Sequence, residues 1–163
     1  MATFSLKPND TVSSNWTTNS GTFSQPHEVL DADSDLHTIS TQAQGRNCIL
    51  EVTDFQAYLN KLPSSQTVTI NSVRHMVAGW VQDTRSDTIE INVKIQYNDG
   101  STVTDLYSEN ETLNFNGYIS EEHFGTSRTT SDGSTAWTTA VLNGLRLHIN
   151  TTPEDPPGGT SAT

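Results

Sequence analysis

Apolar and polar residues alternate with a period of two in several stretches of the chain. In TIEINVKIQY, residues 88 to 97, every second side chain is apolar: Ile89, Ile91, Val93, Ile95 and Tyr97. Successive side chains of a β-strand point to opposite faces, so this pattern predicts a strand with one buried and one solvated face. LRLHIN, residues 145 to 150, predicts a second such strand, with an apolar face of Leu145, Leu147 and Ile149.

Less regular stretches predict the other strands. LHTISTQ (36–42) and NCILEVTDF (47–55) are two apolar runs joined across Gln44 and Gly45. In TVTINSVRHMVAGWVQD (67–83) the apolar positions change parity, which predicts a bulge near Asn71 and Ser72. The Asp99-Gly100 pair predicts a hairpin that returns through TVTDLY (102–107). TLNFNGYIS (112–120) predicts a further strand, broken at Asn116-Gly117.

Polar stretches predict the connections. The chain opens with a short strand, a turn at Pro8, Asn9 and Asp10, and then a long polar approach to about Asp35. Residues 120–135 are predicted to form a long polar loop.

A single helical signal lies between the predicted strands, in TDFQAYLNKLP (53–63). Phe55, Tyr58, Leu59 and Leu62 recur at three- and four-residue spacing, which is the period of an amphipathic helix. Thr53 with Gln56 fits a capping box, and Pro63 ends the run. We expect a short plug helix, over 54–61, that caps the end of the core.

The spacing of these elements predicts the fold. Turn signals separate the strands roughly every 8 to 12 residues, and no repeat of fixed period occurs. The sequence therefore predicts an all-β fold, an antiparallel β-sandwich of jelly-roll type with one short plug helix. We expect the sandwich domain to cover residues 1–150. The Pro- and Gly-rich residues 151–163 should form an extended C-terminal arm.

Composition and charge narrow the classes of partner. Of the 163 residues, Ser and Thr make up about a quarter, and the β-branched Thr favours strands. The net charge of −11 disfavours nucleic acid as a partner, because its recognition depends on clustered Lys and Arg. No stretch approaches the roughly 18 apolar residues of a membrane span, and no signal peptide is evident, so we expect a soluble protein with no membrane partner. Cys48 stands alone, which excludes an internal disulfide.

Asp31, Asp33 and Asp35 occupy alternate positions in VLDADSDLHTIS, and this raises the question of a calcium site. An EF-hand loop that starts at Asp31 would have Leu36 in place of its turn glycine and Gln42 in place of its bidentate glutamate. We expect these aspartates to be a solvated strand entry without a structural metal. An irregular calcium site is the alternative.

Catalytic signatures are missing from the sequence. None of the histidines lies in an HExxH motif, and the chain has no G-x-S-x-G elbow. His75 and His148 lie within apolar alternations and are expected to be hydrogen-bonded core or edge residues, whereas no role is assigned to His27, His37 and His123. The carboxylates of Glu121, Glu122, Glu109 and Glu111 are expected to be solvated surface groups. The sequence predicts no enzyme, and no catalytic, cofactor-binding or metal-binding residues or cofactors.

Trp16, Trp80 and Trp137 allow two interpretations. Exposed tryptophans on a sandwich stack against sugar rings, and Trp80 could lie on an outer face. Buried tryptophans that join two sheets are the commoner case.

Taken together, LKPNDTVSSNWTTNSG, HEVLDADSDLHTIS, TINSVRHMVAGW and AWTTAVLNGLRLHIN resemble a β-sandwich module of virion structural proteins of tailed bacteriophages, of the decoration or fibre type. The resemblance runs from about Leu6 to Asn150. The matching positions are Pro8, Trp16, Glu28, Asp31, Ile39, Ile70, Val73, Trp137, Leu142, Leu145 and Leu147. It implies a structural role on the particle and assigns the aspartate run to a strand entry.

Two functions follow from this resemblance as hypotheses. The first is a capsid decoration, or cement, protein that binds the outer surface of the assembled head, with the major capsid protein and neighbouring copies of itself as partners. Such a protein would be a homo-oligomer on the virion, assembled in the host cytoplasm. The alternative is a carbohydrate- or receptor-binding module of a phage fibre or tail.

Overall fold

The computed structural model describes residues 5–18, 25–26, 39–40, 46–52, 55–64, 67–79, 88–114 and 121–151. Its largest element is a five-stranded sheet in which all neighbouring strands are antiparallel. In order across the sheet, the strands are β1 (Asp10–Ser14), β4 (Asn47–Val52), β9 (Leu145–Thr151), β6 (Thr88–Asn98) and β7 (Val103–Asn114).

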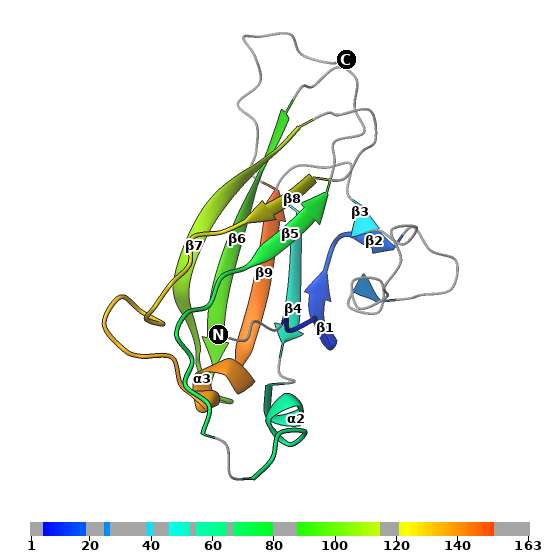
Figure 1. Ribbon diagram of the computed structural model, residues 1–163. Coiled ribbons are helices and arrows are strands. Elements are labelled where there is room, and N and C mark those ends of the chain that lie inside the picture. Colours follow the sequence, from blue (N-terminus) through cyan, green and yellow to red (C-terminus); the bar gives the residue numbers. More distant parts are fainter. Residues whose placement is uncertain are drawn as a thin grey trace, which may run out of the picture.

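Two small antiparallel sheets accompany the large one. β5 (Met76–Gly79) pairs with β8 (Glu121–Phe124), and β2 (Thr17–Thr18) pairs with β3 (Ile39–Ser40). Figure 1 shows β5 and β8 crossing one face of the large sheet as a second layer, and Val77 packs against the core of that sheet. The described residues are mainly β, with antiparallel sheets, as the alternation predicted.

The core follows the predicted alternation. On β6, Ile91, Val93 and Ile95 are buried, whereas the residues between them lie on the other face. On β9, Leu145 and Ile149 are buried. Two apolar clusters result: one contains Cys48, Leu50, Ile91, Val93 and Ile149, and the other contains Phe55, Ile95, Trp137, Leu142 and Leu145. Each fully buried aliphatic side chain contributes about 1.5–3 kcal/mol.

The second cluster is closed by two helices at one end of the large sheet (Figure 1). The predicted plug helix is present as α2 (Phe55–Leu59), with Phe55 fully buried. One helix was expected, but the described residues contain another, α3 (Thr139–Asn143), which buries Leu142. The Thr138 side chain caps α3 by accepting a hydrogen bond from the amide of Val141.

The N-terminus of α2 is held by a residue distant in sequence. The Oδ1 atom of Asn143, at the end of α3, accepts a hydrogen bond of 2.8 Å from the backbone N–H of Gln56. Thr53, the first residue of the predicted capping box, lies outside the described residues. The short helices therefore support one another through a tertiary contact.

Several boundaries differ from the prediction. β1 begins at Asp10, which was predicted to lie in a turn, and continues into the stretch that was predicted to be a polar approach. It is held as a strand by backbone pairing with β4. β8 lies within the predicted loop 120–135. The chain from Val103 to Asn114 is one continuous strand. Of the long strand expected over 67–83, only β5 is a strand among the described residues, although Val73 forms an isolated bridge with Arg128.

The hairpin between β6 and β7 confirms its sequence signal. The Asp99 carboxylate accepts hydrogen bonds from the amides of Ser101 and Thr102, at 2.8 and 2.7 Å. Gly100 has a φ of 92°, which L-residues with a side chain rarely adopt. These contacts hold the pKa of the exposed Asp99 carboxyl below its ordinary value.

β9 extends to Thr151, the first residue assigned to the C-terminal arm. Thr151 is buried, and its hydroxyl oxygen accepts a hydrogen bond of 3.0 Å from the Arg46 amide. Residues 152–163 of the expected arm lie outside the described residues. Neither described helix is long and apolar enough to cross a membrane.

Candidate functional site

Two carboxylates lie on the core-facing side of the large sheet. In the register of β7 against β6, Glu109 is opposite Val93 and Glu111 is opposite Ile91. Cross-strand partners share a face of the sheet, so both glutamates lie beside buried aliphatic residues. Their side chains are only 15% exposed. The prediction that Glu109 and Glu111 are solvated surface groups is therefore wrong.

His75 covers these carboxylates from the second layer. Its side chain is 1% exposed, and its Nε2 atom lies 2.9 Å from Oε1 of Glu111. Because an ionised carboxylate only accepts hydrogen bonds, we assign the proton to Nε2. The other ring nitrogen, Nδ1, faces Oε2 of Glu109 at 3.8 Å and has no hydrogen-bond partner among the described residues.

Glu109 is fixed by groups from the segment that follows β8. The Arg128 guanidinium donates to its Oε1 at 2.5 Å, and the Thr126 amide donates to its Oε2 at 2.8 Å. Burial alone would raise the pKa of Glu109, but the hydrogen bonds from Thr126 and Arg128 and the charge of Arg128 hold it below its ordinary value. The Glu109 side chain is therefore ionised at neutral pH.

Tyr107 lies next to His75 and Arg128. Its ring stacks on His75, with 6.3 Å between the ring centroids, and the Arg128 guanidinium lies 5.2 Å from the Tyr107 ring. Burial, together with the negative charge of Glu109, raises the pKa of Tyr107 to about 12. Its hydroxyl keeps its proton throughout the physiological range.

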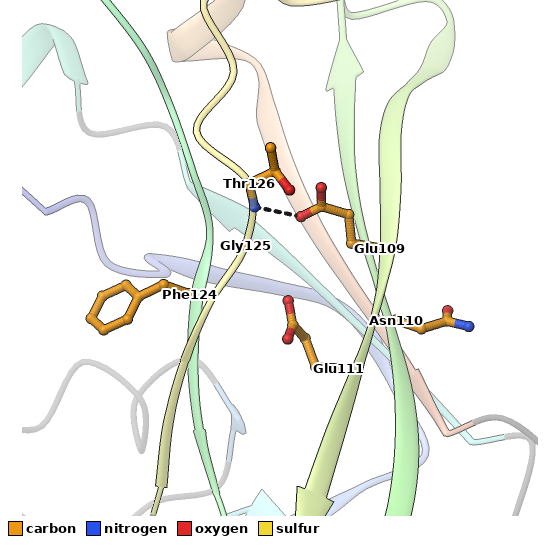
Figure 2. A pocket seen from close by; sticks show the side chains of 6 residues that line it. All are labelled: Glu109, Asn110, Glu111, Phe124, Gly125 and Thr126. Atoms are coloured by element: carbon orange, nitrogen blue, oxygen red, sulfur yellow. Dashed lines mark hydrogen bonds between the residues drawn. The ribbon is translucent and has the colours of Figure 1, made fainter.

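The carboxylates open onto a shallow hollow lined by Glu109, Asn110, Glu111, Phe124, Gly125 and Thr126. Figure 2 shows both glutamates pointing from β7 toward the segment at Gly125 and Thr126, whereas Asn110 and the Phe124 ring point away. Gly125 passes so close that a Cβ atom there would collide with the His75 imidazole and the Glu109 carboxylate. The chain can follow this path only with glycine at position 125.

The burial of His75 makes its imidazole poorly placed to act as a general base. A general base must reach the proton that it abstracts, and the His75 imidazole is almost completely buried. Among the described residues, the imidazole and carboxylate atoms of His75, Glu109 and Glu111 are also close enough to serve as ligands of one metal ion, all within 4.8 Å of one another.

Three of the five histidines lie among the described residues. His75 and His148 are hydrogen-bonded, as expected, and His148 Nε2 lies 2.8 Å from Asn47 Oδ1. Burial and the charge of Lys94 lower the pKa of His148. His123 lies on β8 and is half-buried. His27 and His37 lie outside the described residues.

The site carboxylates had a signal in the sequence. Glu109 and Glu111 share the parity of Tyr107 and Leu113, whose side chains pack on the core clusters. A carboxylate at an inward position of a strand needs a partner from another element. Sequence alone did not indicate that His75 is this partner.

Two of the three tryptophans, Trp16 and Trp137, lie among the described residues. Trp137 is buried, and its Nε1 donates a hydrogen bond of 2.8 Å to the Arg128 carbonyl. Trp16 is half-buried and packs against the first cluster. Trp80 lies outside the described residues, and so do the three aspartates of the run, Asp31, Asp33 and Asp35. Glu122 is exposed, as predicted.

Cys48 does not belong to the site. It is fully buried in the first cluster, and burial raises the pKa of its thiol. Comparison of the chain with family models, curated proteins and solved structures finds no match.

Proposed function

We propose that the protein is a structural component of a bacteriophage virion, a decoration or cement protein that binds the outer surface of the assembled head. Under this proposal its two β layers form a β-sandwich of jelly-roll type. The partners are the major capsid protein and neighbouring copies of this chain. The sequence resemblance to virion modules supports this proposal, and so does the antiparallel two-layer architecture.

The observation that carries the proposal is an exposed apolar pair on the outer face of the second layer. Met76 on β5 and Phe124 on β8 are register partners, and they are 48% and 49% exposed. The Arg74 guanidinium lies 4.3 Å from the centroid of the Phe124 ring. We call these residues, Arg74, Met76 and Phe124, the outer patch.

The residue types of the outer patch are those of protein interfaces. Aromatic residues, Met and Arg are enriched at the buried centres of interfaces, where a few such residues contribute most of the binding energy. In a chain of net charge −11, Arg74 also places a cation beside the Phe124 ring. A fitting partner surface on the shell has an apolar depression with an acidic group at its rim.

The charge of the chain favours the outside of the particle. A net charge of −11 repels packaged DNA, which carries a dense negative charge of its own. A location on the outer surface of the head keeps the acidic protein away from the packaged DNA.

The described tryptophans do not favour the alternative, a sugar-binding module of a fibre or tail. Trp137 is buried and Trp16 is half-buried against the core, so neither provides a flat exposed platform. Phe124 is the large aromatic side chain exposed among the described residues, and the Arg74 guanidinium already lies over its ring.

A binding experiment with purified heads that lack this protein tests the proposal. The heads are incubated with the wild-type protein or with Phe124→Ser, sedimented, and the bound protein is quantified. We expect at least a tenfold loss of affinity for Phe124→Ser, the size of effect expected from removing a central aromatic contact. Val12→Ser is the control, because Val12 is 42% exposed on β1, in the other layer.

Equal binding of the wild type and Phe124→Ser to heads would contradict a role for the outer patch. No binding of the wild type to heads, together with glycan binding that is lost in Phe124→Ser, would favour the alternative function.

Deletion of residues 152–163 tests the arm. It keeps Thr151, which completes β9, and we expect the shortened protein to stay folded but to bind heads less tightly.

A further inference from the structure

A buried nitrogen without a partner points to a second property of the protein. Among the described residues, His75 Nδ1 has no hydrogen-bond partner, although its side chain is 1% exposed. Buried polar atoms are normally paired, and an exception requires an explanation. The nearest charged atom is Oε2 of Glu109, at 3.8 Å, which is too far for a hydrogen bond.

The other side of the imidazole is arranged as it is in metal sites. Histidines that bind a metal through one nitrogen usually donate the other N–H to a carboxylate, a backbone carbonyl or a water molecule, which fixes the tautomer and the orientation of the ring. Glu111 accepts in this way from Nε2 at 2.9 Å. Nδ1 then carries the lone pair, and it lies 3.8 Å from Oε2 of Glu109.

The spacing of the two facing atoms also suits an ion. Two ligands about 2.1 Å from one zinc ion, at tetrahedral to trigonal angles, lie about 3.4–3.6 Å apart. The separation of 3.8 Å between Nδ1 of His75 and Oε2 of Glu109 needs an adjustment of only a few tenths of an ångström.

Gly125 leaves room at this point. A Cβ atom at position 125 would stand in contact with both Nδ1 of His75 and Oε2 of Glu109, between the two prospective ligands. Any other residue would fill this space. The hollow beside the carboxylates is lined by Glu109 and Gly125 and so borders this space.

The local charge favours a cation. Glu109 and Glu111 carry two negative charges, and Arg128 compensates only one of them. The Arg128 guanidinium donates to Oε1 of Glu109 and the Thr126 amide donates to Oε2, so both hold the carboxylate in place, as groups around metal ligands do.

We propose that His75 Nδ1 and the Glu109 carboxylate bind a divalent transition-metal ion, with Glu111 orienting the imidazole. Mixed nitrogen and oxygen donors suit Zn²⁺, whereas Ca²⁺ and Mg²⁺ prefer oxygen donors alone. Water from the hollow completes the coordination. The ion ties the second layer, through His75, to β7 of the large sheet, and this inference does not depend on the proposed function.

Calorimetry and thermal unfolding of the full chain test the site. Protein freed of metals by chelation and dialysis is titrated with Zn²⁺, and with Ca²⁺ in parallel. We expect one Zn²⁺ per chain and a rise in Tm of about 5–10 °C at a hundred times the Kd. Ca²⁺ should have little effect. No zinc-dependent rise in Tm would overturn the proposal.

Variants separate this site from other histidines and aspartates of the chain. Glu109→Gln should remove the zinc-dependent rise, whereas Glu122→Gln, an exposed neighbour on β8, should keep it. Glu111→Gln should weaken zinc binding by about 10- to 100-fold, the usual effect of changing such an orienting group. If Glu109→Gln does not fold, the weaker zinc binding of Glu111→Gln serves as the test of the site. A zinc response that is unchanged in both variants would place the ion elsewhere and overturn the proposal.

A protonated imidazole between the two glutamates is the competing explanation. In that case Zn²⁺ leaves the Tm of the metal-free protein unchanged. This result would also overturn the metal site.

Discussion

His75 and Glu111 join the two layers of the protein through a hydrogen bond of 2.9 Å between Nε2 and Oε1. The histidine precedes β5 of the small sheet, and the glutamate lies on β7 at the edge of the large one. Both side chains are largely buried, so water cannot replace either partner easily.

Removal of the glutamate should therefore destabilise the fold. Glu111→Ala leaves the buried imidazole without its acceptor, and we expect a loss of roughly 1–3 kcal/mol in the free energy of unfolding. Urea denaturation of the metal-free protein measures this loss. Glu122→Ala, at an exposed position of β8, should change stability by less than about 0.5 kcal/mol. Equal stability of the two variants would show that the bond between the layers contributes nothing.

The inner face of β6 can be tested at its centre. Ile91 is 4% exposed in the first core cluster, so Ile91→Asp buries an unpaired charge and should cost several kcal/mol, about 4 or more. Ser108→Asp is the matched control, because Ser108 is exposed on the other face of β7, opposite Lys94. Circular dichroism melts of both proteins check this, and a normal melt for Ile91→Asp would refute the assigned face.

Two glycines should be intolerant for different reasons. Gly144 has an ordinary φ of −114°, but a Cβ atom there would collide with the Asn98 carbonyl and the Tyr97 ring. Gly100 has open space around it and a φ of 92°. We expect Gly144→Ala and Gly100→Ala each to cost roughly 1–3 kcal/mol.

A second substitution distinguishes crowding from backbone conformation. Asn adopts positive φ more readily than Ala, so Gly100→Asn should recover much of the loss. Gly144→Asn should be at least as unstable as Gly144→Ala. Chemical denaturation of the four variants checks this, and recovery at both positions would contradict the crowding at Gly144.

His148 should make stability depend on pH. Burial and the charge of Lys94 lower its pKa in the folded state, so the folded protein favours the neutral imidazole. The resulting stabilisation is complete above the unfolded pKa, about 6.5, and is lost as the pH falls through the folded pKa. Urea unfolding between pH 5 and 8 should show wild type losing more stability toward acid than His148→Gln. Parallel curves for the two proteins would exclude this contribution.

The amino-acid sequence by itself determined the central strands. In β6 and β9 the period-two alternation is unbroken, and the pleat of a strand then assigns Ile91, Val93 and Ile149 to the buried face. The spacing of apolar residues in α2 likewise identified its buried side at Phe55. These elements are encoded locally because their own side chains supply the apolar surface that burial requires.

The edge elements were decided by the tertiary structure. β1 has the sequence DTVSS and β8 has EEHF, and neither shows a buried apolar face of its own. They are strands because β4 and β5 offer unpaired backbone groups to them. α3 similarly depends on packing Leu142 into the second cluster, since its five residues are too few to form a stable helix alone.

The candidate site was decided in the same way. The inward parity of Glu109 and Glu111 is present in the sequence, but their environment is not, because it comes from His75, Gly125 and Arg128 on other segments. An isolated strand would leave both carboxylates in water. Only the packing of the small sheet on β7 excludes that water, and the carboxylates must then be satisfied by the imidazole, the guanidinium and the backbone that cover them.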